Sequence, residues 1–344
     1  MEKVKLSDIC NPKQWRTIPT SDLLNEGYPV YGANGIIGYY SEYNHENPVV
    51  TVTCRGATCG SINITVPNAY ITGNAMCLDD VRSDIEMDYL YYCLKHYNFN
   101  NVISGSAQPQ ITRQGMDKIY ISIYGHDEQK KIVEKLKKVE NIINLRKQEI
   151  QLLDDFIKAR FVEMFGDPIY NTNNLQMKYL SELGDWASGG TPSRNESKYF
   201  EGNINWYSAG ELNTLFLDGS VEKITEKAIE NSSTKLFKEG SMLIGMYDTA
   251  AFKMGILKEA SASNQACACI TPNEKINIIW LYFELQMMKK YFLSQRRGVR
   301  QKNLNLGMIK SFEVPVADRI LQDEFATFVY QVNKLKYVTT KAAV

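Results

Sequence analysis

One long stretch of the chain, residues 127–165, has an uninterrupted helical pattern and separates two similar arms. It contains no Gly and no Pro, and apolar residues recur along it at spacings of mostly four and three. The recurring positions are Ile132, Leu136, Val139, Ile143, Ile150, Leu153 and Ile157. An apolar repeat of about 3.5 residues with Lys and Glu on its flanks predicts a coiled-coil helix, which Gly166 and Pro168 would end. A long core helix of one globular domain fits less well, because the apolar seam is narrow and the polar face is broad.

A second segment near the C-terminal end repeats the same apolar spacing. Its recurring positions are Leu321, Phe325, Phe328, Val332 and Leu335. Aligning Gln129 with Gln322, an offset of 193 (322 minus 129), places Val344 opposite Gln151. The second helix therefore lacks counterparts of residues 152–164, and we expect it to be truncated. We also expect the far end of the central helix to expose Leu153, Ile157 and Phe161, for a partner subunit or a second copy to cover.

The two arms share an order of short strands followed by one helix. In the first arm, a Gly-rich hairpin over 28–40, strands at 48–53 and 61–66, a helix over 88–97 and a strand over 118–124 are indicated. In the second arm, strands are indicated at 204–207, 243–247, 255–257 and 267–269, and a helix over 279–292. Short segments also match between the arms: 178–183 with 5–9, 264–267 with 74–77, and 307–310 with 115–118. This long repeat predicts two homologous domains related by pseudo-symmetry.

Composition limits the class of protein. The chain has 344 residues, 44% of them hydrophobic and 23% charged, which is typical of globular chains with two or more domains. Its formal net charge is zero, so any nucleic-acid binding must come from local patches. The first residues lack the apolar core of a signal peptide and no apolar run is long enough to span a membrane, so we expect a cytoplasmic protein with no membrane partner.

Cysteine usage and known catalytic motifs point away from an enzyme. The seven cysteines include no C-x-x-C pair and the three histidines lie far from any cysteine pair in the chain, so we expect no metal site and a reducing compartment. Hydrolase, zinc-protease and nucleotide-binding motifs are absent, as is the Asn/Asp-Pro-Pro-Tyr/Phe segment of adenine methyltransferases. We therefore expect no catalytic residue in this chain.

The remaining chemistry is suited to reading nucleic acid. The same place in both arms, after the helix, holds a polar loop. Gln or Asn side chains can pair with adenine and Arg or Lys with guanine, whereas Ser, Thr, Lys and backbone amides suit phosphate. The loop candidates are Gln108, Gln110, Thr112 and Arg113 in the first arm and Arg297, Arg300, Lys302 and Asn303 in the second. Further DNA-binding candidates are Lys13, Arg16, Arg55, Thr191, Ser193 and Arg194. Any one of these residues, taken singly, also fits a solvated surface loop, and the duplicated position favours the functional interpretation.

Several segments together resemble one known family. They are 28–43 with its Tyr-Gly-Ala-Asn-Gly-Ile-Ile-Gly core, 55–60, 105–112, 127–136, 153–168, 190–194 and 321–335. In these segments, which span nearly the whole chain, the sequence resembles the specificity subunit of type I restriction-modification enzymes. The one departure is the short second helix.

The resemblance implies an α+β fold with two target-recognition domains built on mixed β-sheets, separated by long helices that form an antiparallel coiled coil. The expected limits are 1–125 and 167–317 for the recognition domains, 126–166 for the central helix and 318–344 for the C-terminal helix. Each domain would read one half of a bipartite site in double-stranded DNA, and the coiled coil would dock methyltransferase subunits. S-adenosylmethionine would bind to those subunits, ATP and Mg²⁺ would bind to motor-nuclease subunits, and this chain would bind no cofactor.

Two other functions are compatible with the sequence. A truncated or silent copy could act as a coiled-coil interaction or anti-restriction protein that no longer reads DNA and associates with itself. A fused methyltransferase is the third hypothesis, and the missing motifs argue against it. Sequence-specific DNA binding at moderate salt distinguishes a specificity subunit from a silent copy, because non-specific phosphate contacts weaken steeply with salt.

Overall fold

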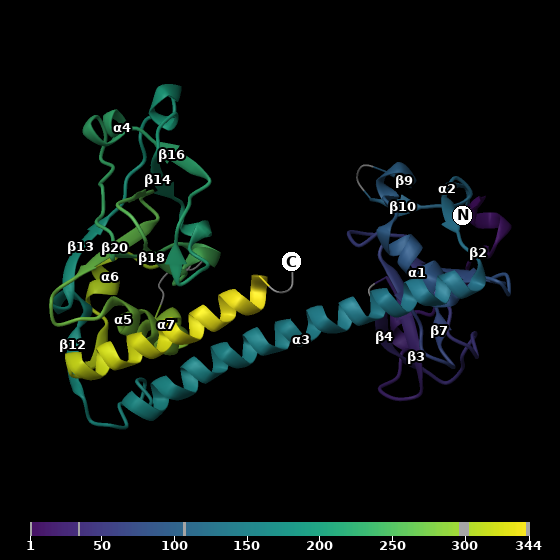
Figure 1. Ribbon diagram of the computed structural model, residues 1–344, viewed down its shortest axis with the longest axis horizontal. Helices are drawn as coiled ribbons and strands as arrows, with labels where there is room; N and C mark the ends of the chain where they lie inside the picture. Colours follow the sequence, from purple (N-terminus) through teal and green to yellow (C-terminus); the bar gives the residue numbers. More distant parts are fainter. Residues whose placement is uncertain (1, 34, 106–107, 296–302, 342–344) are drawn as a thin grey trace. The chain divides into compact units, whose positions relative to one another are not determined.

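The long helix expected from the apolar repeat is present. In the computed structural model, which describes residues 2–33, 35–105, 108–295 and 303–341, helix α3 runs from His126 to Phe165 (Figure 1). It ends at Gly166, whose φ is +78° and whose N–H donates to the Val162 carbonyl at 2.8 Å. This is the left-handed C-terminal cap that glycine adopts without steric cost, so the predicted end of the helix is confirmed.

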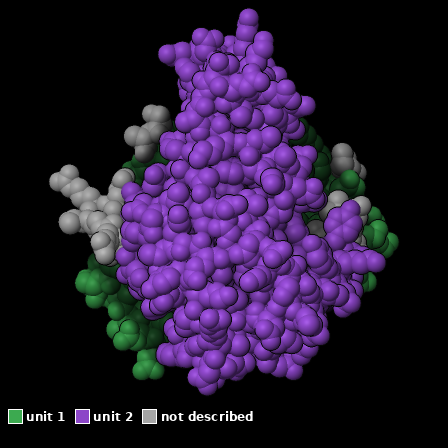
Figure 2. Space-filling view, turned by 90° about the vertical axis from the view of Figure 1, so that its left-hand side faces the viewer, with its two compact units in different colours: residues 1–144 green, residues 145–344 purple. Residues whose placement is uncertain are grey.

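The chain forms two compact units, Met1–Asn144 and Leu145–Val344, and the division falls within α3 (Figure 2). The helices of the first unit outside α3 are α1 (Met87–His96) and α2 (Arg113–Met116). Its strands are β1 (Glu2–Lys5), β2 (Asn11–Gln14), β3 (Tyr28–Gly32), β4 (Gly35–Tyr40), β5 (Val50–Thr53), β6 (Ile62–Ile64), β7 (Tyr70–Ile71), β8 (Ala75–Asp79), β9 (Ile103–Ser104), β10 (Gln110–Ile111) and β11 (Tyr120–Ile123).

The second unit contains helices α4 (Glu226–Glu230), α5 (Ile278–Ser294), α6 (Leu306–Lys310) and α7 (Arg319–Lys341). Its strands are β12 (Gln176–Tyr179), β13 (Gly184–Ser188), β14 (Ile204–Tyr207), β15 (Phe216–Leu217), β16 (Glu222–Ile224), β17 (Met242–Gly245), β18 (Met254–Leu257), β19 (Ala262–Ser263), β20 (Cys267–Pro272) and β21 (Glu313–Val316). Strand β20 contains the strand predicted at 267–269, and Cys267 and Cys269 are both buried on it.

The two units repeat one topology. The sheet β2-β8-β5-β6 corresponds to β13-β20-β17-β18, to which the second unit adds β15. In a smaller sheet, β3 pairs antiparallel with β4 and parallel with β7, and β14 pairs in the same two ways with β16 and β19. A two-stranded ladder, β1–β11 or β12–β21, joins the first and last strands of each arm. The expectation of two homologous domains with mixed sheets is confirmed.

A buried glutamine locks the same junction in both units. The Gln129 amide oxygen accepts from the Glu86 N–H at 2.9 Å, and its nitrogen donates to the Tyr124 carbonyl at 2.8 Å. Gln322 repeats both bonds, with the Asn277 N–H at 2.7 Å and the Ala317 carbonyl at 2.7 Å. Glu86 and Asn277 are the residues that precede α1 and α5. Each glutamine therefore fastens the first turn of a long helix to the start of its domain's own helix.

Helices α3 and α7 pack antiparallel in the second unit, α7 alongside the C-terminal half of α3 (Figure 1). Contacting residues that have higher residue numbers on α3 have partners with lower residue numbers on α7. Thr339 donates to Glu149 at 3.3 Å, Lys336 forms an ion pair with Asp154, the rings of Phe328 and Phe156 lie 5.1 Å apart, and those of Phe325 and Phe161 lie 5.3 Å apart. The antiparallel coiled coil is confirmed for this part of the chain.

The expected exposure of Leu153, Ile157 and Phe161 is wrong. Ile157 and Phe161 are buried and Leu153 is partly buried against the same core. The cause is the antiparallel direction, since the first turns of α7 cover the last turns of α3. Other apolar positions of the two helices stay exposed. They include Leu136, Val139, Ile143, Leu145 and Leu152 earlier on α3, Phe156 and Val162 nearer its end, and Ile320, Leu321, Leu335 and Val338 on α7.

The core of the second unit contains an unpaired acid. Glu284 on α5 is fully buried, and among the described residues neither carboxylate oxygen has a hydrogen-bond partner. Burial raises the pKa of the Glu284 carboxyl well above its usual value. The folded state therefore holds this proton more tightly than the unfolded chain, and stability falls as the pH rises above the unfolded pKa of about 4.3.

We expect Glu284→Gln to remove this pH-dependent loss. The free energy of unfolding of the variant should exceed that of the wild type by about 1–3 kcal/mol near pH 8, with a smaller gain near pH 5. Denaturant unfolding at the two pH values measures the difference. Glu274→Gln, at an exposed position of the same unit, is the control and should change little at either pH. An equal effect of Glu284→Gln at both pH values would contradict the prediction.

Of the helices in the described ranges, none is long and apolar enough to cross a membrane.

Candidate nucleic-acid interface

In the first unit, the predicted polar loop lies against the turn that follows β5. Arg55 forms an isolated antiparallel bridge with Gln110. The Ile111 N–H donates to the Cys54 carbonyl at 3.0 Å, and the Gly56 N–H donates to the Pro109 carbonyl at 3.1 Å. We call residues 54–60 with 108–112 the turn–loop site of unit 1. The fold thus brings together candidates that are about fifty residues apart in the chain.

The candidate side chains at the turn–loop site of unit 1 differ in whether they make hydrogen bonds within the domain. Arg55, Gln108 and Gln110 are exposed, and Gln110 lies in the short strand β10 rather than in a loop. The Thr112 hydroxyl instead caps α2, since its Oγ1 accepts from the Gly115 N–H at 3.1 Å. Arg113 donates through Nη2 to Asn11 Oδ1 at 2.9 Å. Thr112 and Arg113 therefore help to hold the site in place, and the other three side chains face solvent.

The second unit has the same arrangement. The Leu304 N–H donates to the Met246 carbonyl at 2.8 Å, which corresponds to the bond between Ile111 and Cys54. The Asn303 Oδ1 accepts from the Asp248 N–H at 3.1 Å. We call residues 246–253 with 303–305 the turn–loop site of unit 2. Three other candidates of the second arm, Arg297, Arg300 and Lys302, lie outside the described residues.

Two lysines at this second site were not predicted from the sequence. Lys253 closes the turn, and its Nζ donates to the Gly210 carbonyl at 3.4 Å. On α5, burial and the nearby charge of Lys253 lower the pKa of Lys289. The two residues come from different elements and no local pattern links them, so only the folded structure shows that positive charge gathers here.

The phosphate-binding candidates follow the edge strand of each main sheet. In the first unit, Lys13 lies on β2 with its ammonium 3.8 Å from the centre of the Trp15 ring, and Arg16 is exposed beyond the strand. In the second unit, Thr191 and Ser193 are exposed after β13, and the Thr191 hydroxyl hydrogen-bonds to Gln265 Oε1. The two groups of candidates therefore occupy equivalent places.

Arg194 is already engaged within its own domain. Its guanidinium donates from Nη1 and Nη2 to the two oxygens of Glu222, at 2.5 and 2.8 Å, and lies 4.3 Å from the centre of the Phe200 ring. The hydrogen bond from Arg194 holds the pKa of the Glu222 carboxyl below its usual range. Binding of a phosphate by Arg194 would require this pair to open or to share its donors.

A third group of polar side chains in unit 1 includes two residues of β8. His45, Cys77 and Asp79 bring three ligand atoms of metal-binding type within 4.8 Å of one another.

The fold and the paired sites define a protein that contains two copies of one domain topology together with long helices. Each domain has an exposed polar turn–loop site. The model of the type I restriction modification DNA specificity domain matches residues 1–154 and 173–341. The chain belongs to this family, and both units carry the match.

Individual relatives and solved structures agree with this assignment. The chain is 26% identical over 180 residues to the type I restriction enzyme EcoR124I/EcoR124II specificity subunit of Escherichia coli, a match that covers 51% of this chain and 42% of that protein. It is 26% identical over 156 residues to the MjaIX specificity subunit of Methanocaldococcus jannaschii, covering 44% and 36%. The matches thus span less than half the length of these relatives.

Among solved structures, a type I restriction-modification S subunit from M. genitalium superposes with a TM-score of 0.63 at 14% identity, over 99% of this chain and 91% of that one. A second chain, from a study of complex assembly and conformational transition of the type I R-M system, gives a TM-score of 0.59 at 16% identity, over 99% and 93%. At these identities the likeness supports the fold.

Proposed function

We propose that this chain is the DNA sequence-specificity subunit of a type I restriction-modification complex, in which each unit reads one half of a bipartite DNA site. The observation that carries the proposal is the duplication of the turn–loop site. The same backbone hydrogen bond, from Ile111 to Cys54 in one unit and from Leu304 to Met246 in the other, fixes a polar loop against a turn at equivalent positions. A duplicated exposed site in two duplicated domains fits recognition of two half-sites.

Within each site, different side chains serve different purposes. Gln108 and Gln110 offer amides that can pair with the major-groove edge of adenine, and Arg55 offers a guanidinium for guanine or phosphate. In the second unit, Asn303 corresponds to Gln110, and Arg297, Arg300 and Lys302 precede it in the sequence. Lys13, Arg16, Thr191, Ser193 and Arg194 would contact phosphate and so position the domains without specifying sequence.

Docking of partner subunits is the second part of the proposal. The apolar positions exposed on α3 and α7, among them Val139, Leu145 and Leu335, are flanked by Lys and Glu and lack cover among the described residues. Exposed apolar stripes of this kind mark protein interfaces. We assign them to methyltransferase subunits, which would supply S-adenosylmethionine and flip the target adenine. Motor-nuclease subunits with ATP and Mg²⁺ would join for cleavage, and this chain would contribute no catalytic residue.

The direct test is to co-express the chain with a cognate methyltransferase subunit and to map adenine methylation across genomic DNA. A bipartite motif with a fixed spacer is the expected result and reveals both half-sites. If the complex forms but no motif appears, the chain is an interaction module that does not read DNA. The exposed apolar stripe would then serve partner binding or self-association alone. Light scattering separates these two, because self-association gives a mass above that of one chain.

A single substitution tests the turn–loop site of unit 1. We expect Gln110→Ala to weaken binding of the preferred first half-site by about 1–3 kcal/mol and to relax the base preference at one position. The second half-site should remain unchanged and serves as an internal control. Gln114→Ala, at an exposed glutamine of α2, should leave both half-sites unchanged. A uniform loss of affinity for all sequences would instead assign Gln110 to phosphate contact, which competitive binding to randomised half-sites can detect.

A further inference from the structure

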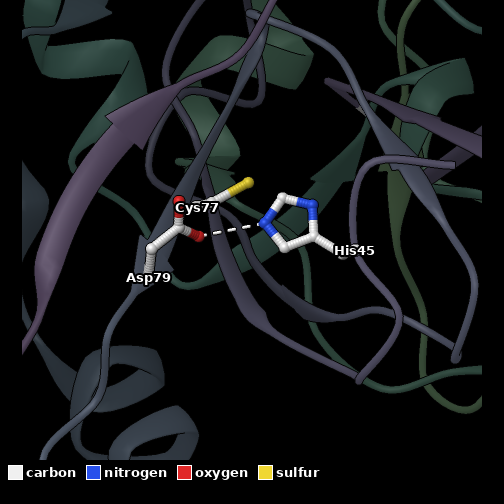
Figure 3. Close-up of side chains that lie close together, drawn as sticks. All are labelled: His45, Cys77 and Asp79. Atoms are coloured by element: carbon white, nitrogen blue, oxygen red, sulfur yellow. Dashed lines mark hydrogen bonds and ion pairs between the residues drawn. The ribbon is translucent and has the colours of Figure 1, made fainter.

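Three potential metal ligands converge in the first unit, beside β8 (Figure 3). Cys77 and Asp79 are two residues apart on this strand and so point to the same face of the sheet. His45 reaches them from the loop that precedes β5, and two backbone hydrogen bonds with Ala69 hold that loop in place, at 3.0 Å each. The His45 Nε2 lies 3.0 Å from Asp79 Oδ1, and the Cys77 sulfur lies within 4.8 Å of both atoms.

The hydrogen bonds around His45 determine which ring nitrogen carries hydrogen. The Asn44 side chain is oriented by two bonds with Ile71: its Oδ1 accepts from the Ile71 N–H at 2.9 Å, and its Nδ2 donates to the Ile71 carbonyl at 3.0 Å. Asn44 Oδ1 is therefore an acceptor, and the His45 Nδ1 that lies 2.8 Å from it must donate. A metal-binding histidine usually donates its other ring N–H to an oxygen acceptor, such as a carboxylate, a backbone carbonyl or water, and the Asn44 oxygen takes this place for His45.

The other ring nitrogen then faces an acceptor. In the neutral imidazole, Nε2 carries a lone pair, and this lone pair points at the carboxylate oxygen of Asp79. The second oxygen of Asp79 already accepts from Trp15 Nε1–H at 3.0 Å. A lone pair and a carboxylate oxygen at this distance need a positive species between them, either a proton or a metal ion.

The position of Cys77 favours a metal ion over a proton. A proton satisfies His45 and Asp79 and leaves the sulfur unused, and among the described residues the Cys77 thiol has no hydrogen-bond partner. Two nitrogen or oxygen ligands of a tetrahedral zinc ion, each about 2.0–2.2 Å from it, lie about 3.3 Å apart. The observed separation of 3.0 Å between Nε2 and Oδ1 is close to this value. Zinc binds the thiolate form of cysteine, so coordination by the Cys77 sulfur would release the thiol proton to solvent.

A cleft supplies room for a fourth ligand. His45 and Asp79 line a cavity of about 730 Å³, together with Asn44, Trp15 and Lys13. Lys13 is the cation of this group, and its ammonium lies over the Trp15 ring rather than against the carboxylate. An ion held by His45 and Asp79 would border this cleft, where a water molecule can complete the coordination.

We propose that His45 Nε2, Cys77 Sγ and Asp79 Oδ1 bind one Zn²⁺ ion, with the fourth coordination position facing the cleft. The mixed sulfur, nitrogen and oxygen ligands suit zinc and do not suit Mg²⁺ or Ca²⁺, which prefer oxygen alone. The ion ties the loop before β5 to the main sheet of the first domain. None of the three ligands is a residue that we propose to contact DNA, although Lys13 lines the same cleft, and the inference does not depend on the proposed function.

The test uses the full chain, stripped with a chelator and titrated with Zn²⁺ and, separately, with Co²⁺. We expect one zinc ion per chain and, with Co²⁺, a tetrahedral spectrum with a thiolate-to-metal charge-transfer band. Asn44→Ala removes the orienting partner of His45 together with its two hydrogen bonds to Ile71, and should weaken zinc binding by about 10–100-fold. His45→Gln removes the imidazole ligand and Asp79→Asn removes the negative charge of the carboxylate ligand, and both should weaken zinc binding further.

Two control variants match these changes. Asp80→Asn alters the next acid along, which also lines the cleft and bonds to Asn11, and Cys269→Ser alters an equally buried strand cysteine of the second unit. Both should bind zinc as the wild type does. The proposal is overturned if the wild type binds no zinc, if the cobalt spectrum lacks the thiolate band, or if His45→Gln and Asp79→Asn bind normally. The cobalt spectrum of the wild type tests for coordination by a thiolate even if a variant fails to fold.

Discussion

Replacing Phe161 by alanine is expected to lower the free energy of unfolding of the second unit by about 3–5 kcal/mol. The Phe161 side chain is fully buried where α3 meets α7. Its ring lies edge-on to Phe325, with centroids 5.3 Å apart, and tilted against Phe165 at 5.0 Å. Truncation removes the buried apolar surface and leaves a cavity that two long helices cannot easily close. Urea unfolding followed by circular dichroism measures the loss.

Phe156→Ala is the matched control for this change. Phe156 lies on the same helix and contacts Phe328, but 54% of it is exposed. Phe156→Ala should lower the free energy of unfolding by about 1 kcal/mol or less, because folding buries only part of the Phe156 side chain. Equal effects at the two positions would mean that the contact between α3 and α7 does not form in solution as described.

The second large effect is expected at Gln322. We expect Gln322→Met, which keeps the length of the side chain, to cost the second unit about 3 kcal/mol, because the Asn277 N–H and the Ala317 carbonyl lose their buried partner. Gln129→Met should produce the same loss in the first unit. Thermal unfolding of both variants measures the two losses side by side.

Gln331→Met distinguishes the junction from a general effect on α7. This glutamine is exposed on the same helix, so its replacement should change stability by no more than about 0.5 kcal/mol. If Gln322→Met is as mild as Gln331→Met, water takes over the hydrogen bonds of the junction, and the glutamine is not what fastens it.

Local patterns in the sequence predicted the elements of this fold well. The apolar repeat and Gly166 define α3, and the Gly-rich segment after Tyr28 forms the hairpin of β3 and β4. The offset that aligns Gln129 with Gln322 also holds in the structure, where both side chains make equivalent hydrogen bonds. These features depend on residues close in sequence or on internal repetition, and both are visible without coordinates.

Features that depend on long-range packing escaped sequence reasoning. The exposure expected at Phe161 was wrong, because aligning the two helices in parallel says nothing about which turns of α7 cover which turns of α3. The convergence of His45 with Cys77 depends on a loop docking against a strand far along the chain. The lone Glu284 also looks unremarkable in a helical pattern, and only its burial makes it unusual.

The two-stranded ladders that join the ends of each arm affect how such a chain can evolve. In each arm the first and last strands are hydrogen-bonded neighbours, β1 with β11 and β12 with β21, so the entry and exit points of the arm lie side by side. A segment whose ends meet can be replaced as a cassette with two cuts, and the register of the other arm is left intact. New combinations of arms can therefore arise by shuffling whole cassettes, with no need for gradual change inside either one.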